Sequence, residues 1–273
     1  MRHPDVDKLK TIARDIRIDI LTMLAEAKSG HPGGSLSSVE ILVALYFYKL
    51  RHDPKNPDWD GRDRFLLSKG HVCPALYAVL SAAGYFPKKE LLTLRKFGSS
   101  LQGHQKKGSP AGVEIASGSL GQGLSIANGM ALAMRLDAKK SRIYCLMGDG
   151  ETHEGQVWEA AMTSSHYKLD NLCAIIDYNK LCIDGKIEEV MCLEPYMDKW
   201  RSFGFNVIDV VDGHDLKQLM DAYDRAEKTI GRPTIIICYT VKGKGVSFME
   251  NVCEWHGVAP NKEQLDKALK ELK

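Results

Sequence analysis

Apolar residues along this chain follow two alternating patterns. From Val6 to about Lys28 they recur every three or four residues, which predicts an amphipathic helix. Further along, short unbroken apolar runs alternate with helical patterns. These runs predict buried strands at residues 65–68, 142–147, 172–177, 206–211 and 234–240. Strands that alternate with helices predict an α/β fold, in which a parallel sheet is covered by helices on both faces.

Helical spacing also predicts the segments that connect the strands. These helices cover residues 38–50, 75–83, 88–96, 118–136, 154–168, 216–229 and 262–272. Ser37 or Ser38 is placed to cap the first of them. No helix is expected to continue through residues 29–34, which are rich in glycine and proline. Because no repeat or composition break interrupts the pattern, residues 1–273 are expected to form a single domain.

Polar residues follow two of the predicted strands. Gly148-Asp149-Gly150 comes directly after the strand at 142–147, and Asn179 follows the strand at 172–177. Because a helix connects these parallel strands, both ends are expected at the sheet edge where ligands bind. A carboxylate and an amide oxygen suit Mg²⁺, which completes its shell with phosphates and water, and glycines let a diphosphate approach the backbone. On spacing alone, a metal–diphosphate site and an ordinary glycine-rich turn are both open.

Four of the nine histidines lie in predicted loops flanked by glycine: His31, His71, His104 and His256. Imidazoles can donate hydrogen bonds to sugar hydroxyls and phosphates and can move protons near neutral pH. Lys69 and Lys242 lie beside the same loops and could offset the charge of a diphosphate. Taken singly, each of these side chains is more often an ordinary surface residue, and only their number favours a site.

Composition excludes several classes of protein. A net charge of +2 gives no indication of nucleic-acid or membrane binding, and no apolar run is long enough to span a membrane. The first residues lack the apolar core of a signal peptide. Seven cysteines without a CxxC pair predict reduced thiols in a cytoplasmic protein, with three in predicted strands: Cys145, Cys173 and Cys238. The fingerprints of nicotinamide dehydrogenases, P-loop NTPases and zinc hydrolases are missing from the sequence.

Together these motifs resemble transketolase. Gly-Asp-Gly followed about thirty residues later by Asn179 is the family's thiamine diphosphate signature. Similar segments occur in the same order from about Asp5 to Lys273, at residues 29–33, 62–71, 103–104, 118–123, 211–214, 242–245 and 255–257. The resemblance implies the thiamine diphosphate-binding fold of the family's N-terminal, diphosphate-binding (PP) domain.

The resemblance also implies roles for single residues. The metal ligands would be Asp149, Asn179 and the backbone carbonyl of Leu181. The cofactor would be thiamine diphosphate with Mg²⁺ or Ca²⁺, contacted by Lys69, His71, Gly118, Ser119, Leu120, Gly150, Glu154, Asn179, Ile183, Lys242 and His256. Of these, Glu154 matches a glutamate near the family's subunit interface. The catalytic histidines, which line the substrate channel and assist proton transfer, would be His31, His71, His104 and His256.

Two residues depart from the family pattern. Gly34 stands where some relatives have a small hydroxyl residue near the cofactor, so one polar contact is expected to be missing. Gln105 replaces the proline that often follows the channel histidine, which leaves the pose of His104 open.

The implied activity is transfer of a two-carbon ketol unit from a ketose phosphate to an aldose phosphate, as in the pentose phosphate pathway. A full transketolase is much longer than this chain. The pyrimidine-binding domain, whose glutamate activates the cofactor, and the C-terminal domain are therefore expected on a partner subunit. The chain is expected to be one subunit of a split transketolase, a heterotetramer of the α2β2 kind, inactive alone. Alternatives are a subunit of a 1-deoxyxylulose-5-phosphate synthase-like enzyme or of a transketolase for unusual sugars, or a non-catalytic binding subunit.

Overall fold

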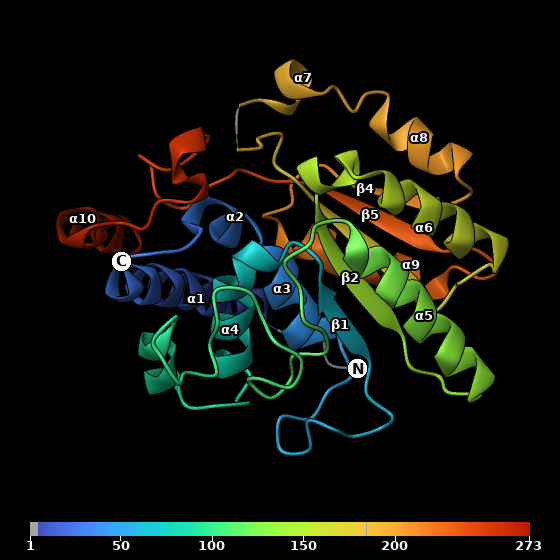
Figure 1. Ribbon diagram of the computed structural model, residues 1–273, viewed down its shortest axis with the longest axis horizontal. Helices are drawn as coiled ribbons and strands as arrows, with labels where there is room; N and C mark the ends of the chain where they lie inside the picture. The colour runs from blue at the N-terminus through green and yellow to red at the C-terminus, as the bar shows by residue number, and fades with distance from the viewer. Residues whose placement is uncertain (1–4, 184) are drawn as a thin grey trace.

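The computed structural model describes residues 5–183 and 185–273. Its centre is a five-stranded sheet in the order β1-β2-β3-β5-β4, in which every pairing is parallel (Figure 1). The strands are β1 (Arg64–Leu67), β2 (Ile143–Gly148), β3 (Leu172–Tyr178), β4 (Asn206–Val210) and β5 (Thr234–Tyr239). The predicted strands and their parallel arrangement are thus confirmed. The expectation about a signal peptide concerned the first residues, of which 1–4 lie outside the described part.

Strand side chains point alternately into two cores. On β2, Tyr144 and Leu146 belong to one core, whereas Cys145 and Met147 belong to the other. The first core includes residues of α1 (Val6–Ala27), α3 (Val39–Ala44), α4 (Cys73–Ala82) and α9 (Leu216–Lys228). The second includes residues of α5 (Gln122–Leu136), α6 (Gly155–His166) and α8 (Tyr196–Ser202). Figure 1 shows α5 and α6 side by side along one face of the sheet. Helices therefore cover both faces, and the predicted fold class is confirmed.

Several helical segments differ from the prediction. The stretch at 29–34, expected to be non-helical, contains the start of α2 (Pro32–Ser37). Proline suits a first helical position because its φ is already helical and its missing N–H is not needed there. Ser38 does not cap the next helix, because its hydroxyl donates to the Gly34 carbonyl at 2.8 Å.

Other segments are short or irregular. The helix predicted at 38–50 continues from α3 into a π-helix, η1 (Leu45–Lys49), and the one predicted at 88–96 is a 3₁₀ helix, η3 (Lys88–Thr93). Both α7 (Ile187–Val190) and α8 were missed. The remaining elements are η2 (Gly70–Val72), η4 (Gly150–His153), η5 (Cys253–His256) and α10 (Lys262–Glu271).

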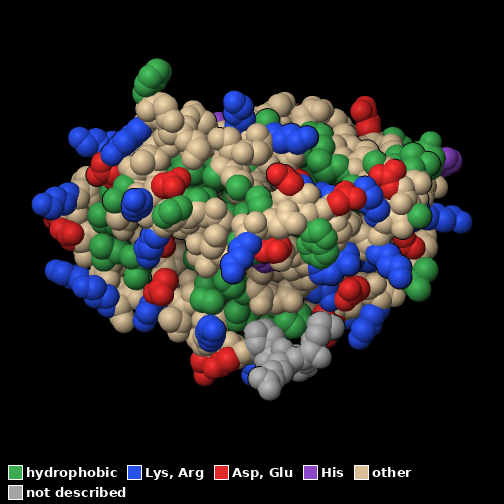
Figure 2. All heavy atoms as spheres, turned by 90° about the horizontal axis from the view of Figure 1, so that it is seen from below, with side chains coloured by type: hydrophobic (Ala, Val, Ile, Leu, Met, Phe, Trp, Pro, Cys, Tyr) green, Lys and Arg blue, Asp and Glu red, His purple; other side chains and the backbone are tan. Residues whose placement is uncertain are grey.

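Surface and core chemistry agree with the composition. Cys145, Cys173 and Cys238 are buried, free thiols, as predicted. Figure 2 shows basic and acidic side chains interspersed on one face of the molecule. Within the described residues, no helix combines the length and apolar character needed to cross a bilayer.

Candidate functional site

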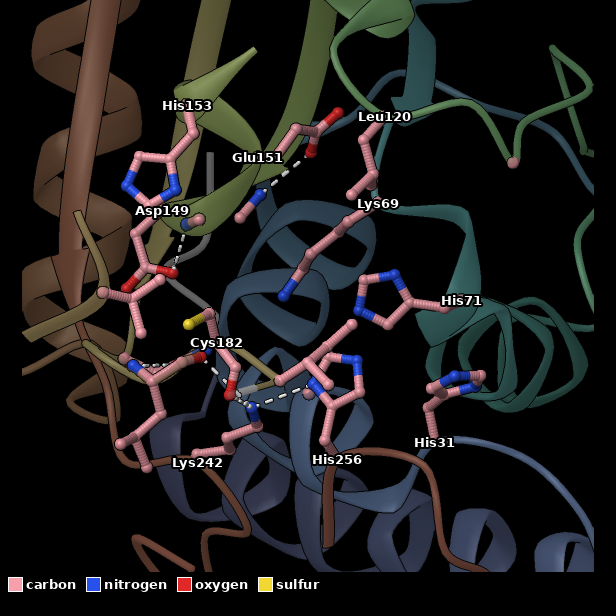
Figure 3. Close-up of a pocket in the computed structure, with 18 of the residues that line it drawn as sticks. His31, Lys69, His71, Leu120, Asp149, Glu151, His153, Cys182, Lys242 and His256 are labelled. Carbon is pink, nitrogen blue, oxygen red and sulfur yellow. Dashed lines mark hydrogen bonds between the residues drawn. The ribbon is translucent and has the colours of Figure 1, made fainter. Parts of the chain in front are cut away.

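A pocket of about 380 Å³ lies at the carboxyl edge of the sheet (Figure 3). Its wall is built at the ends of four strands: Lys69 after β1, residues 148–151 from the last residue of β2 onward, residues 179–183 after β3 and Lys242 after β5. Because all strands are parallel, these segments meet at one edge, as expected for a ligand site in an open α/β sheet.

Most of the residues predicted for the site line this pocket. They are His31, Lys69, His71, His104, Gly118, Leu120, Asp149, Gly150, Asn179, Leu181, Ile183, Lys242 and His256. Of the predicted residues, Ser119 and Glu154 are not among the described lining residues, and both are exposed. Ser119 lies in the same turn as two lining residues, whereas Glu154 precedes the first residue of α6. Their contact with a cofactor stays a prediction.

The carboxylate of Asp149 is buried, with the residue 2% exposed. It accepts hydrogen bonds from the backbone N–H groups of Gly150 at 2.7 Å and Lys180 at 2.5 Å. Burial, together with the nearby charge of Asp177, raises the pKa of Asp149 to about 7 despite these bonds. A cation bound here would compensate the charge that the buried site disfavours.

Two further oxygens lie in the turn after β3, which pairs directly with β2 as predicted. Asn179 donates through Nδ2 to Asp177 at 3.2 Å, and its Oδ1 accepts from the Leu181 N–H at 3.1 Å. Lys180, between them, has a left-handed φ of 63°, which turns the chain sharply. The Leu181 carbonyl accepts from the Lys242 ammonium at 3.1 Å.

This donor set fits a hard divalent cation. One carboxylate, one amide oxygen and one backbone carbonyl are the ligand types that Mg²⁺ and Ca²⁺ take. The described residues contain no group of three or more His, Cys, Asp or Glu suited to a metal. A metal in this pocket would therefore depend on the mixed set of Asp149, Asn179 and Leu181.

Glycines keep part of the pocket wall open. A Cβ added at Gly148 or Gly150 would meet its nearest neighbour at 3.5 Å, so a side chain there would occupy pocket space without clashing. Gly118 adopts a φ of +154°, which side chains rarely permit. Exposed backbone of this kind suits the close approach of a diphosphate, so the pocket also fits that part of thiamine diphosphate.

Three histidines form a cluster on the other side of the pocket from Asp149 (Figure 3). Ring centroids are 5.1 Å apart for His31 and His71, 5.4 Å for His31 and His256, and 5.2 Å for His71 and His256. The prediction placed them in loops. His31 does lie in a loop, directly before the first residue of α2, whereas the other two lie in the 3₁₀ helices η2 and η5. His104 is in a loop, as predicted, and is exposed.

The clustered imidazoles are neutral near pH 7. Burial lowers the pKa of His31 to about 4, helped by the charge of Arg95. Burial and the charge of Lys242 lower that of His256 to about 4, and burial holds that of His71 well below its usual value. His31 Nδ1 is buried and finds no hydrogen-bond partner among the described residues. Neutral rings can both donate and accept, so this nitrogen is available to a ligand.

A carboxylate that was not predicted from the sequence lies beneath the pocket. Asp177 is fully buried and forms an ion pair with the Lys69 ammonium. It also accepts from Ser37 at 2.5 Å and from the Thr240 hydroxyl. Burial favours its neutral form, but the charge and hydrogen bond of Lys69 outweigh burial and hold the pKa of Asp177 below its usual value. The available signal was an acidic residue at the end of an apolar predicted strand.

Glu151 was missed as well. It is 3% exposed and accepts hydrogen bonds from the Ser68 hydroxyl and from the backbone N–H groups of Gly121 at 2.8 Å and Gly148 at 3.1 Å. The carboxylate thus joins the ends of β1 and β2 to the start of α5, and burial raises its pKa. No spacing in the sequence distinguishes it from an exposed glutamate.

The structure shows the surroundings of Gly34 and Gln105, the two residues that depart from the family pattern. A Cβ on Gly34 would lie 2.8 Å from Val72 Cγ1, so a larger residue would require a shift. Gln105 is 2% exposed, and its Nε2 donates to the Leu67 carbonyl at 2.8 Å. This bond holds the segment carrying His104 against the end of β1.

Comparison with known proteins agrees with this geometry. Residues 8–272 match the family model for the transketolase thiamine diphosphate-binding domain. The chain is 45% identical over 272 residues to a 6-deoxy-6-sulfo-D-fructose transketolase subunit of Clostridium sp. strain MSTE9, covering 100% of this chain and 98% of that protein. It is 42% identical over 267 residues to an apulose-4-phosphate transketolase subunit of Phocaeicola vulgatus, covering 98% and 94% respectively.

Solved structures give the same picture. The transketolase of Leishmania mexicana superposes with a TM-score of 0.92 at 30% identity, over 97% of this chain and 41% of that one. That of Campylobacter jejuni gives 0.91 at 34% identity, over 98% and 43%. The chain therefore spans less than half the length of these solved transketolases.

Proposed function

The chain belongs to the transketolase family as a thiamine diphosphate-binding domain, and from this premise we propose that it is the metal- and diphosphate-binding subunit of a two-component transketolase. The complete enzyme would move a two-carbon ketol unit from a ketose to an aldose. The observation that carries this proposal is one pocket lined both by the oxygen-bearing residues Asp149, Asn179 and Leu181 and by a cluster of neutral histidines.

The chain's own residues would bind and orient the cofactor. Thiamine diphosphate, when bound, supplies the carbon nucleophile that cleaves a ketose beside its carbonyl. Asp149, Asn179 and the Leu181 carbonyl would hold a divalent cation, Mg²⁺ or Ca²⁺. Lys242 would offset diphosphate charge, while Lys69 is neutralised by Asp177 and would act through that pair.

The histidines would contact the sugar substrate. His31 would bind a sugar hydroxyl through Nδ1, the buried nitrogen that lacks a partner among the described residues. His256 Nδ1 faces the Lys242 ammonium at 3.0 Å, so this nitrogen accepts and Nε2 carries the proton. His256 would therefore donate from Nε2, and His104, at the exposed rim, would contact the incoming sugar.

A partner subunit is part of the proposal. Relatives that this chain covers nearly end to end are named as transketolase subunits, which supports a second polypeptide carrying the pyrimidine-binding and C-terminal domains. We propose that residues 1–273 form one domain, that two copies of each chain assemble, and that the assembly is cytoplasmic.

A second candidate concerns the substrate. The similar subunits are named for 6-deoxy-6-sulfo-D-fructose and apulose 4-phosphate, which favours an unusual sugar bearing a sulfonate or phosphate over the ketose phosphates of the pentose phosphate pathway. Steady-state rates with sulfonated, phosphorylated and uncharged ketoses would separate these candidates.

The two-component proposal is tested by measuring ketol transfer with thiamine diphosphate and Mg²⁺, by the chain alone and with its partner subunit. Activity is expected only in the mixture. Asp149→Ala should abolish metal-dependent cofactor binding in the mixture, whereas Asp198→Ala, on the exposed surface of α8, should not change it. Robust activity of the chain alone would refute the two-component enzyme, and unchanged cofactor affinity of Asp149→Ala would refute the metal site.

A further inference from the structure

A buried ionic network joins α1, α3 and the segment after β4. Glu40 and Arg17 are each 6% exposed, and Arg17 donates from both terminal nitrogens to the two Glu40 carboxylate oxygens, at 2.6 and 2.7 Å. His214 Nδ1 lies 2.8 Å from Glu40 Oε2. Burial favours the neutral acid, but the charge of Arg17 and the hydrogen bonds from His214 and Arg17 outweigh it and lower the pKa of Glu40 to about 2. Glu40 is therefore ionised.

Both ring nitrogens of His214 have fixed roles. An ionised carboxylate can only accept, so the Nδ1 facing Glu40 must carry a proton. Nε2 lies 2.9 Å from the backbone nitrogen of Val241, whose N–H can only donate, so Nε2 must be the unprotonated acceptor. The neutral ring with its proton on Nδ1 satisfies both contacts, and Glu40 thereby sets the tautomer that holds Val241.

The Glu40 carboxylate also anchors a second point of the loop after β5, the loop that contains Val241 and Lys244. Arg17, which is fixed by its two bonds to Glu40, also donates from Nε to the Lys244 carbonyl at 2.9 Å. Lys242 lies between the two anchored peptide groups. The backbone on both sides of Lys242 is thus tied to Glu40, through His214 on one side and Arg17 on the other.

The side chain of Lys242 reaches the cofactor pocket. The residue is 2% exposed, and its ammonium donates to the carbonyls of Leu181 at 3.1 Å and Cys182 at 3.4 Å. It also lies 3.0 Å from His256 Nδ1, and Figure 3 shows it between these groups. The position of the Lys242 backbone therefore decides where a positive charge, a proposed metal-ligand carbonyl and a proposed catalytic histidine meet.

We propose that His214, oriented by Glu40 and Arg17, is a positioning residue that fixes the Lys242 ammonium in the cofactor pocket. This inference rests on the proposed function, which assigns Lys242 to the diphosphate. Neither His214 nor Glu40 is among the described residues that line the pocket, so both act through Lys242. A lysine on an anchored backbone gives up less freedom when an anion binds, and this lowers the cost of binding.

Three substitutions separate the two contacts of His214. In His214→Gln the amide oxygen can take the place of Nε2 and still accept from Val241. In His214→Asn the shorter amide takes the place of Nδ1 and keeps the bond to Glu40, but it does not reach Val241. His214→Phe keeps a ring of similar size and loses both bonds. His166→Asn, at the exposed end of α6, is the matched control.

The first measurement is the dissociation constant of thiamine diphosphate with Mg²⁺ in the assembled enzyme, by titration calorimetry, beside the free energy of unfolding of each variant. Residues that support a ligand-binding group typically contribute about 10–100-fold in affinity. His214→Asn and His214→Phe should weaken binding by at least about tenfold. His214→Gln and His166→Asn should bind as the wild type does.

A purely structural role of His214 predicts a different ranking of the variants by cofactor affinity. It predicts that affinity follows stability, so that His214→Asn, which keeps the Glu40 bond, binds at least as well as His214→Gln. Equal affinity of the Asn and Gln variants, or wild-type affinity of His214→Phe, would overturn the inference.

A second measurement needs no cofactor. Backbone hydrogen exchange at residues 241–245 of the full chain should be faster in His214→Asn and His214→Phe than in the wild type and His214→Gln, with exchange in β3 unchanged. Identical exchange in the wild type and His214→Phe would overturn the inference. Failure of the wild-type assembly to bind cofactor would instead refute the proposed function, and the exchange experiment would still decide the role of His214.

Discussion

Replacing Asp177 by asparagine should be among the most destabilising isosteric changes in this protein. The carboxylate is 0% exposed and pairs with Lys69, whose side chain is 3% exposed. It also accepts hydrogen bonds from Ser37 and Ser38, at 2.5 and 3.3 Å, and from Thr240. Asp177→Asn keeps the shape but removes the ion-pair partner of the buried Lys69 ammonium.

The magnitude follows from that unpaired charge. Removing one partner of a buried ion pair typically costs about 3–5 kcal/mol, whereas replacing both partners by neutral groups costs far less. We therefore expect Asp177→Asn to lower the free energy of unfolding by about 3–5 kcal/mol. The double variant Lys69→Met/Asp177→Asn should recover much of this loss, because both charges of the buried ion pair are then removed together.

Equilibrium urea denaturation at pH 7.5 measures both effects, with stability taken by linear extrapolation. At this pH Asp177 is ionised, because its pKa lies below its usual value. Asp198→Asn is the control, since Asp198 pairs with Arg201 on the surface, with side chains 70% and 54% exposed. Exposed pairs contribute about 0–1 kcal/mol. A loss below about 1 kcal/mol for Asp177→Asn, or a double variant whose loss is the sum of the single losses, would refute the reasoning.

Three further outcomes are expected. Gly243→Ala should lower the free energy of unfolding, measured by urea denaturation, by about 1–3 kcal/mol more than Gly231→Ala. Both glycines have φ near +80°, but only a Cβ at position 243 would meet a backbone oxygen, at 2.2 Å. Equal losses of stability would contradict this. The lowered pKa values of His31 and His256 give stability that is fully present above pH 6.5 and lost as the pH falls from 6.5 toward 4. The urea midpoint should therefore drop over that range, and it should drop less in a His31→Asn/His256→Asn variant. The same dependence of the midpoint on pH in both proteins would argue against neutral, buried rings. Trp200→Phe should cost far less than the roughly 3–5 kcal/mol of Trp200→Ala, because phenylalanine keeps an aromatic ring in the buried space between Trp158 and Phe205; similar losses for the two variants would contradict this.

The sheet could be predicted from the sequence because its central strands are buried on both faces. Every residue of β3 is buried, so its sequence is an almost continuous apolar run. Such a run lacks the spacing of three or four residues that would predict an amphipathic helix. Helix α2 could not be predicted in this way, since Pro-Gly-Gly has poor helix propensity. Tight packing stabilises it instead, with room for no Cβ at Gly34 beside Val72.

The pocket was predictable in part for a related reason. Asp149 and Asn179 follow neighbouring parallel strands connected by a single α-helix, α6, so their proximity follows from chain topology alone. The residues proposed to position Lys242 do not follow from topology. Glu40 and His214 are 174 residues apart, and only the packing of α3 against the loop after β4 brings them together. Asp177 and Glu151 were missed because a buried carboxylate is recognised by its donors, which come from distant segments.

The span of the pocket along the chain has a consequence for how the molecule would respond to its ligand. Its lining runs from His31, near the first helix, to His256, close to the last one, and includes the ends of four strands. A bound cofactor would therefore act as a non-covalent cross-link between early and late parts of the sequence. At a ligand concentration of about 100 times Kd this link adds about 2.7 kcal/mol to the stability of the folded state. Resistance to proteolysis should accordingly rise along the whole chain, including segments far from the pocket.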